Sequence, residues 1–147
     1  MTSTPIEKAV ALQGQGFGCA QSVLSAFASQ YGLDEKTALK MASPLGGGVA
    51  RHGDVCGAVT GALLVLGLVR GADTTAGKEE VYRLSQVFLR QFEARHGTLL
   101  CRELIDYDLT SPEGLQKARE SEIFTTLCPV LVRDAAELIQ SFLETTG

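Results

Sequence analysis

Hydrophobic residues recur at steps of three and four along most of this chain, which is the spacing of an amphipathic α-helix. The first row ends at Gly32, a residue favoured just past a helix C-terminus, and Asp34 offers a cap for a short helix that Pro44 stops. A third row predicts a helix from about Lys78 to His96, with acids in its first turn and bases in its last. The rows are Ala20, Val23, Leu24, Phe27, Ala28 and Tyr31; Ala38, Leu39, Met41 and Ala42; and Val81, Leu84, Val87, Phe88 and Phe92.

The last third of the chain is also helical in pattern. Ser111 and Pro112 form a cap followed by proline at the first helical position, which predicts a helix running towards Phe124. An apolar stripe from Val130 to Glu144 predicts a closing helix, and no segment shows the sustained alternation of a half-buried strand. We therefore expect an all-α fold, a compact single-domain bundle of six or seven helices over all 147 residues.

The most apolar stretch, Val55 to Val69, is 15 residues long and lies between Asp54 and Arg70. A membrane-spanning helix needs about 20 apolar residues, so this stretch predicts a buried core helix instead. The N-terminus carries neither a cationic leader nor an apolar signal region. We expect a soluble, cytoplasmic protein with no membrane contact, in a compartment where cysteines tend to be free, metal-bound or catalytic.

The charge balance limits the partners. Thirteen Lys and Arg against 17 Asp and Glu give a net charge of −4. Because nucleic-acid binding needs a basic face, we expect no nucleic-acid partner. The sequence leaves the oligomeric state open.

Four cysteines are the candidate chemistry, and what they share is a position at the predicted start of a helix. Free N–H groups and the positive end of the helix dipole stabilise an anion there, so each thiol is expected to be shifted towards thiolate. No Cys-x-x-Cys pair is present, which disfavours a zinc ribbon or a thioredoxin-like motif. The predicted starts are marked by Gly18 before Cys19, by the caps Asp54 before Cys56 and Thr98 before Cys101, and by Cys128 itself as a cap with Pro129 at the first helical position.

The segment that follows Cys56 has small residues four apart. Gly57 and Gly61, with Ala58 and Ala62, give one helix a smooth face that allows another backbone to approach closely. Such a contact would bring Cys56 near a partner cysteine.

With these residues the chain resembles the C_GCAxxG_C_C family, over roughly residues 17–143. The family's hallmark Cys-Gly-Ala-x-x-Gly matches residues 56–61, and its first cysteine matches Cys19 in Gly-Cys-Ala-Gln. Its glycine run matches residues 46–48, and its last two cysteines match Cys101 and Cys128. The resemblance implies redox activity, or the holding of an iron–sulfur cluster or a similar group.

Three hypotheses follow. In the leading one, Cys19, Cys56, Cys101 and Cys128 form one site that binds an iron–sulfur cluster for electron transfer, with zinc as the alternative metal. In the second, the same thiols perform metal-free dithiol–disulfide chemistry, for which four cysteines permit three complete pairings. In the third, the cysteines are buried core residues of an accessory protein that docks onto an oxidoreductase or a transporter.

Other candidates are weaker. His52 could join a metal site or act as a base for Cys56, but a solvated loop histidine is the better interpretation. The glycine loop lacks the Lys-Ser/Thr of a phosphate-binding loop.

Overall fold

The computed structural model describes residues 3–145, and this part of the chain forms helices and no strand. The all-α prediction is confirmed: residues 3–145 form eight α-helices of five residues or more, in place of the expected six or seven, and one single-turn helix. The helices are α1 (Pro5–Gly14), α2 (Cys19–Ala28), α3 (Glu35–Ala42), α4 (Gly57–Arg70), α5 (Lys78–His96), α6 (Cys101–Ile105), α7 (Pro112–Glu120), the single turn α8 (Ile123–Thr126) and α9 (Cys128–Thr145).

Two of the predicted helix caps form as expected, each with its side chain accepting a hydrogen bond from the backbone N–H three residues later. Asp34 accepts a hydrogen bond from the Thr37 N–H at 3.1 Å, and Ser111 accepts one from the Gly114 N–H at 3.0 Å. The additional helix α1 begins with the same chemistry, because Thr4 accepts from the Glu7 N–H at 3.1 Å. Thr4 followed by Pro5 is a typical helix start, but the hydrophobic pattern alone did not predict a helix here.

The helix predicted to run from Ser111 towards Phe124 is divided in two. Helix α7 ends at Glu120, and Glu122 takes a left-handed conformation with φ of 63° before α8 begins. A left-handed residue cannot continue a right-handed helix, so the chain changes direction here.

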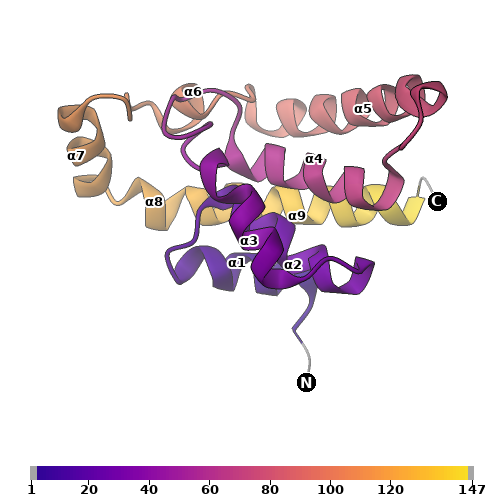
Figure 1. Cartoon of the computed structure of the whole chain (residues 1–147). Helices are drawn as coiled ribbons and strands as arrows, with labels where there is room; N and C mark the ends of the chain where they lie inside the picture. The colour runs from indigo at the N-terminus through magenta and orange to yellow at the C-terminus, as the bar shows by residue number, and fades with distance from the viewer. Residues whose placement is uncertain (1–2, 146–147) are drawn as a thin grey trace.

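The helices are arranged in layers (Figure 1). The long helix α9 lies against α4 and against α1 and α2, while α5 runs alongside α4 and also contacts α9. Helices α6, α7 and α8 gather at the end where α9 begins. Helices α2, α4, α6 and α9 all start at that end of the molecule, among the described residues.

The most extensive helix–helix contact joins α2 and α4, and it is made by small residues. A Cβ on Gly61 would lie 2.8 Å from the Ala20 carbonyl oxygen and 3.1 Å from the Val23 Cβ, too close for any side chain. Ala58 and Ala62 are fully buried. The predicted close approach of another backbone to this helix face is confirmed, and its partner is α2.

The buried apolar residues form two clusters. The larger one is built by α1 to α5 and α9 around Phe27, Phe88 and Phe92, and burial of each phenyl ring contributes about 1.5–3 kcal/mol. The smaller one joins α6, α7 and the start of α9, and includes Cys101 and Cys128. The stretch from Val55 to Val69 mostly forms α4 inside the larger cluster, and no helix among residues 3–145 is long and apolar enough to cross a membrane.

The α2–α4 contact can be tested with two glycines of the same helix. Gly61→Ala is expected to destabilise the fold by about 1–3 kcal/mol, because the methyl group collides with Ala20. Gly67→Ala is the matched control: nothing lies within 4 Å of its Cβ position, so it should stabilise the helix by about 0.5–1 kcal/mol. Urea unfolding followed by circular dichroism measures both, and equal effects of the two substitutions would contradict the contact.

Candidate redox site

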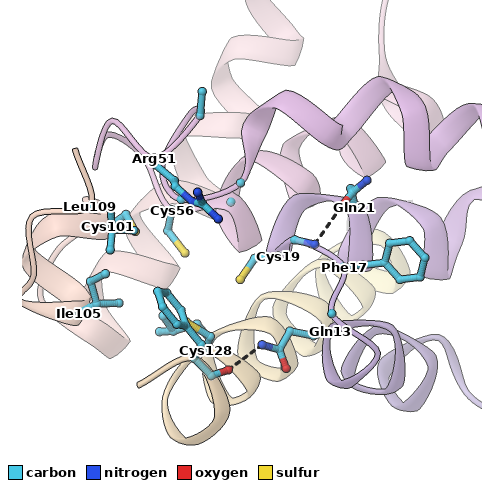
Figure 2. A pocket seen from close by; sticks show the side chains of 18 of the residues that line it. Gln13, Phe17, Cys19, Gln21, Arg51, Cys56, Cys101, Ile105, Leu109 and Cys128 are labelled. Carbon is cyan, nitrogen blue, oxygen red and sulfur yellow. Dashed lines mark hydrogen bonds between the residues drawn. The ribbon is translucent and has the colours of Figure 1, made fainter. Parts of the chain in front are cut away.

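The four cysteines line one cavity of about 690 Å³ between the two apolar clusters. Cys56 belongs to the larger cluster, Cys101 and Cys128 belong to the smaller one, and Cys19 packs against both. In Figure 2 the thiols of Cys19 and Cys56 point into this space, with Cys128 on the opposite side. The fold therefore brings together thiols from four separate elements.

Every cysteine lies at a helix start, as the sequence predicts. Cys19, Cys101 and Cys128 are the first residues of α2, α6 and α9, and Cys56 is the residue before α4. Three of the predicted caps are wrong, because Cys56 itself occupies the cap position of α4, Leu100 occupies that of α6, and Cys128 is the first residue of α9 with Pro129 second.

The residues predicted as caps have other partners. The backbone of Asp54 accepts a hydrogen bond from Cys101 at 2.7 Å, while Thr98 Oγ1 accepts one from the Leu100 N–H at 3.1 Å. Asp54 is therefore held by pairing with the segment before α6, whereas Thr98 is held by a hydrogen bond within its own segment.

An isolated antiparallel bridge between Val55 and Leu100 holds two of the cysteines side by side. The Cys56 N–H donates to the Leu99 carbonyl at 2.8 Å, and the Cys101 N–H donates to the Asp54 carbonyl. Neighbouring residues of a bridge point to opposite faces. Cys56 and Cys101 therefore lie together on the face opposite Val55 and Leu100, which is the face of the cavity.

Glutamine side chains fix the opposite wall. Gln21 Oε1 accepts a hydrogen bond from the Gly18 N–H at 2.9 Å, and its Nε2 donates to the Leu39 carbonyl at 2.9 Å, which fixes the start of α2 (Figure 2). Gln13 Nε2 donates to the Phe124 carbonyl at 2.8 Å, so α1 is tied to α8 beneath the cavity.

The expected shift of all four thiols towards thiolate is wrong for three of them. Burial raises the pKa of Cys56 to about 11, although the backbone N–H groups of Ala58 and Val59 oppose this shift. Burial, followed by the neighbouring thiols of Cys56 and Cys128, raises the pKa of Cys101 to about 12. The helix N-terminus does act on Cys56, but loss of water outweighs it.

Cys19 and Cys128 behave as a pair. The Cys19 thiol donates a hydrogen bond to the Cys128 sulfur, which raises the pKa of Cys19 well above its ordinary value, helped by burial. The same hydrogen bond lowers the pKa of Cys128, against the effect of burial. Within the pair, Cys128 is therefore the sulfur that loses its proton first.

The donor chemistry of the cavity suits iron or zinc, because both take thiolate ligands. The positions of the donors do not fit: among residues 3–145 no group of three or more Cys, His, Asp or Glu side chains is arranged to hold a metal ion. All four cysteines are free thiols. The iron–sulfur and zinc expectations therefore stay predictions.

His52 is exposed, with Nδ1 3.8 Å from Asp54 Oδ2, and it does not line the cavity, as expected for a solvated loop residue.

The loop before α4 has a left-handed backbone that the sequence pattern did not predict. Residues 47–51 all have φ between 50° and 68°, and three of them, Val49, Ala50 and Arg51, are not glycine. Each non-glycine residue costs roughly 1–2 kcal/mol in this conformation. Gly48 is packed so tightly that its Cβ would lie 2.7 Å from the Cys101 Cβ, so the loop rests directly on the site.

Two functional candidates were missed by sequence reasoning. Arg51, at the end of the left-handed segment, and Arg119, on α7, both line the cysteine cavity. Neither arginine belongs to a motif. Only the closeness of Arg51 to the glycine run at residues 46–48 could have indicated a role for it.

Comparison with known proteins adds a family. Residues 17–142 match the family model described as "Putative redox-active protein (C_GCAxxG_C_C)". The chain belongs to this family. Comparison with curated proteins and comparison with solved structures each gave no match. The family resemblance seen in the cysteine pattern is confirmed, and the match extends over all four cysteines of the cavity.

The hydrogen bond within the cysteine pair makes a measurable prediction. Cys128 should be the first thiol alkylated by iodoacetamide at pH 7, with a rate that falls in acid as its thiolate is protonated. Cys19→Ala removes the donor, so the pKa of Cys128 rises and its alkylation at pH 7 slows by roughly three- to tenfold. Mass spectrometry of the alkylated peptides gives the rate of each thiol.

Cys19→Ser is the matched control, because its hydroxyl can donate the same hydrogen bond and should keep most of the rate. Faster alkylation of Cys56 or Cys101 than of Cys128 would contradict the assignment.

Proposed function

We propose that this protein is a thiol–disulfide oxidoreductase in which Cys128 and Cys19 are the reacting pair. The observation that carries the proposal is that Cys19 and Cys128 are free thiols on the wall of one cavity, where their interaction shifts the pKa values of the two in opposite directions. A nucleophilic cysteine needs a thiolate, a partner thiol within reach and access for the substrate. The pair supplies the first two, and the cavity supplies the third, because its lining includes the exposed side chains of Arg51 and Arg119.

The exchange takes place in two balanced steps. The Cys128 thiolate attacks one sulfur of a substrate disulfide, forming a mixed disulfide and releasing the other half as a thiolate. The Cys19 sulfur, after losing its proton, then attacks the Cys128 sulfur, forms the Cys19–Cys128 disulfide and releases the second half. The two cysteines lose two electrons and two protons, and the substrate leaves as two thiols. A dithiol reductant returns the pair to its starting state.

Cys56 and Cys101 are assigned a supporting role. Their raised pKa values keep both thiols protonated near neutral pH, so neither is expected to begin the exchange. Their negative charge, if formed, would raise the pKa of Cys19 further. As neutral, buried thiols they exclude water from the pair without competing for the substrate.

The test uses a neutral substrate, bis(2-hydroxyethyl) disulfide. Reduced protein is expected to lose two hydrogens and to form a Cys19–Cys128 disulfide, mapped by mass spectrometry of peptides under non-reducing conditions. Cys128→Ser should abolish the reaction, while Cys19→Ser should stop at the mixed disulfide on Cys128, because no second thiol attacks it.

Cys56→Ala and Cys101→Ala are the matched controls and should retain the exchange. A first disulfide that joins Cys56 and Cys101, or a reaction that survives Cys128→Ser, would refute the assigned pair. The accessory-protein hypothesis makes a different prediction, namely that a variant without any of the cysteines keeps its fold and its binding to an oxidoreductase or transporter partner.

An iron–sulfur cluster, with zinc as the alternative, is the second candidate, and one observation favours it. A dithiol reaction needs two cysteines, whereas four thiols from four elements line this cavity. A cluster bound there would supply one-electron transfer, and Cys19, Cys56, Cys101 and Cys128 would have to move closer together to hold it.

This candidate predicts iron and sulfide in stoichiometric amounts, with visible absorption, in protein purified without oxygen or reconstituted. Zinc in a stoichiometric amount would instead support the alternative metal. Colourless protein with four reactive thiols and neither metal, even after reconstitution, would rule out this candidate.

A further inference from the structure

Two cationic side chains line the cysteine cavity, and none of the described residues that line it carries a carboxylate. Arg51 and Arg119 are lining residues, whereas no Asp, Glu or Lys is among the residues that line it. Within the described range, 3–145, neither arginine forms an ion pair. Their neighbour Arg102 is different, because its Nη1 lies 3.4 Å from Asp54 Oδ1. The cavity is therefore locally positive in a chain whose net charge is −4.

The position of Arg51 is built into the backbone. Arg51 ends the left-handed segment, and its N–H donates to the Gly46 carbonyl at 3.0 Å. The preceding Ala50 N–H donates to the Pro44 carbonyl at 2.8 Å. Burial of Val49 does not explain this unfavourable backbone, since that side chain is 39% exposed. What the segment achieves is to direct the Arg51 side chain towards the thiols of Cys56 and Cys19 (Figure 2).

The size and lining of the cavity suit a small molecule. Its volume of about 690 Å³ falls within the range of pockets that enclose small ligands, about 300–1,000 Å³. Apolar side chains from α7, α8 and α9, which are Leu115, Phe124 and Leu131, form part of the lining. A ligand with an apolar or sulfur-containing middle and an anionic end would match both kinds of surface.

The geometry points to a small disulfide that carries a carboxylate as the substrate class, with Arg51 and Arg119 as the residues that select it. Guanidinium groups bind carboxylates through paired, charge-assisted hydrogen bonds, so the anionic end is held at the arginines while a substrate sulfur faces Cys128. This inference rests on the proposed thiol–disulfide function and adds the substrate's charge to it.

The reaction remains balanced with this substrate. The Cys128 sulfur forms a bond to the nearer substrate sulfur, the substrate S–S bond breaks, and a carboxylate-bearing thiolate leaves and takes up a proton. Cys19 then displaces the second half from Cys128. Two electrons pass from the cysteine pair to the disulfide, and both products are carboxylate-bearing thiols.

The experiment compares three disulfides of similar size: 3,3′-dithiodipropionate (anionic), bis(2-hydroxyethyl) disulfide (neutral) and cystamine (cationic). We expect the wild-type protein to react roughly three- to tenfold faster with the anionic compound than with the neutral one, and more slowly with the cationic one. Arg51→Gln and Arg119→Gln should each reduce the ratio of the anionic to the neutral rate, and the double variant should bring this ratio to about one. Raising the ionic strength should weaken the preference in the wild type.

Arg90→Gln is the matched control, because Arg90 is an exposed arginine on α5 that does not line the cavity. Equal rates for the anionic and neutral disulfides, or a preference that persists in the double arginine variant, would overturn the inference. If the wild-type protein did not react with the neutral disulfide at all, that result would instead refute the thiol–disulfide function.

If the wild type does not react with disulfides, selection of anionic molecules by the two arginines can still be tested by alkylation, because alkylation requires only a nucleophilic thiol. Iodoacetate should then alkylate the protein faster relative to iodoacetamide in the wild type than in the double arginine variant. An unchanged ratio would overturn the inference independently of the function.

Discussion

The close contact between α2 and α4 is the constraint on which the site depends. Gly61 allows the two backbones to approach until only a hydrogen atom fits between it and Ala20. One turn earlier, the Cβ position of Gly57 lies 3.3 Å from the Cys19 Cβ. The same contact that packs the core thus aligns the starts of both helices and places Cys19 beside the Cys56 segment. Glycine in a helix costs about 1 kcal/mol relative to alanine, and at these positions the packing requires it.

The chemistry of the cysteines follows from a competition between two electrostatic effects. A helix N-terminus stabilises a charge by about 0.3–1 kcal/mol when exposed to water, whereas one pKa unit corresponds to about 1.4 kcal/mol and burial can shift a pKa by several units. Burial prevails at Cys56 and Cys101, whose thiols stay protonated. At Cys128 a direct hydrogen bond from Cys19 opposes burial and prevails. The four thiols therefore differ in their pKa values although all lie at helix starts.

The loop between α3 and α4 connects the packing to the chemistry. Its left-handed segment lies on Cys101, its end pairs with the strand-like residues before α6, and Arg51 lines the cavity. Hydrogen bonds from the N–H groups of residues 49–54 to other backbone carbonyls maintain this conformation. Unfavourable backbone conformations persist where the surrounding structure fixes them, and they cluster at functional sites. Arg51 and Cys101 are consequently positioned by the same loop.

Local physics explains what the sequence alone determined. The helix from Lys78 to His96 was predicted at its observed bounds, and Asp34 and Ser111 cap as expected, because periodicity and caps depend on residues within a turn of one another. The cysteine positions at helix starts were predictable for the same reason. Tertiary structure alone decided that Cys56 caps α4, that Cys19 pairs with Cys128, and that Arg51 joins them. These features arise from burial and from contacts between residues far apart in the chain, and neither can be predicted from the local sequence pattern.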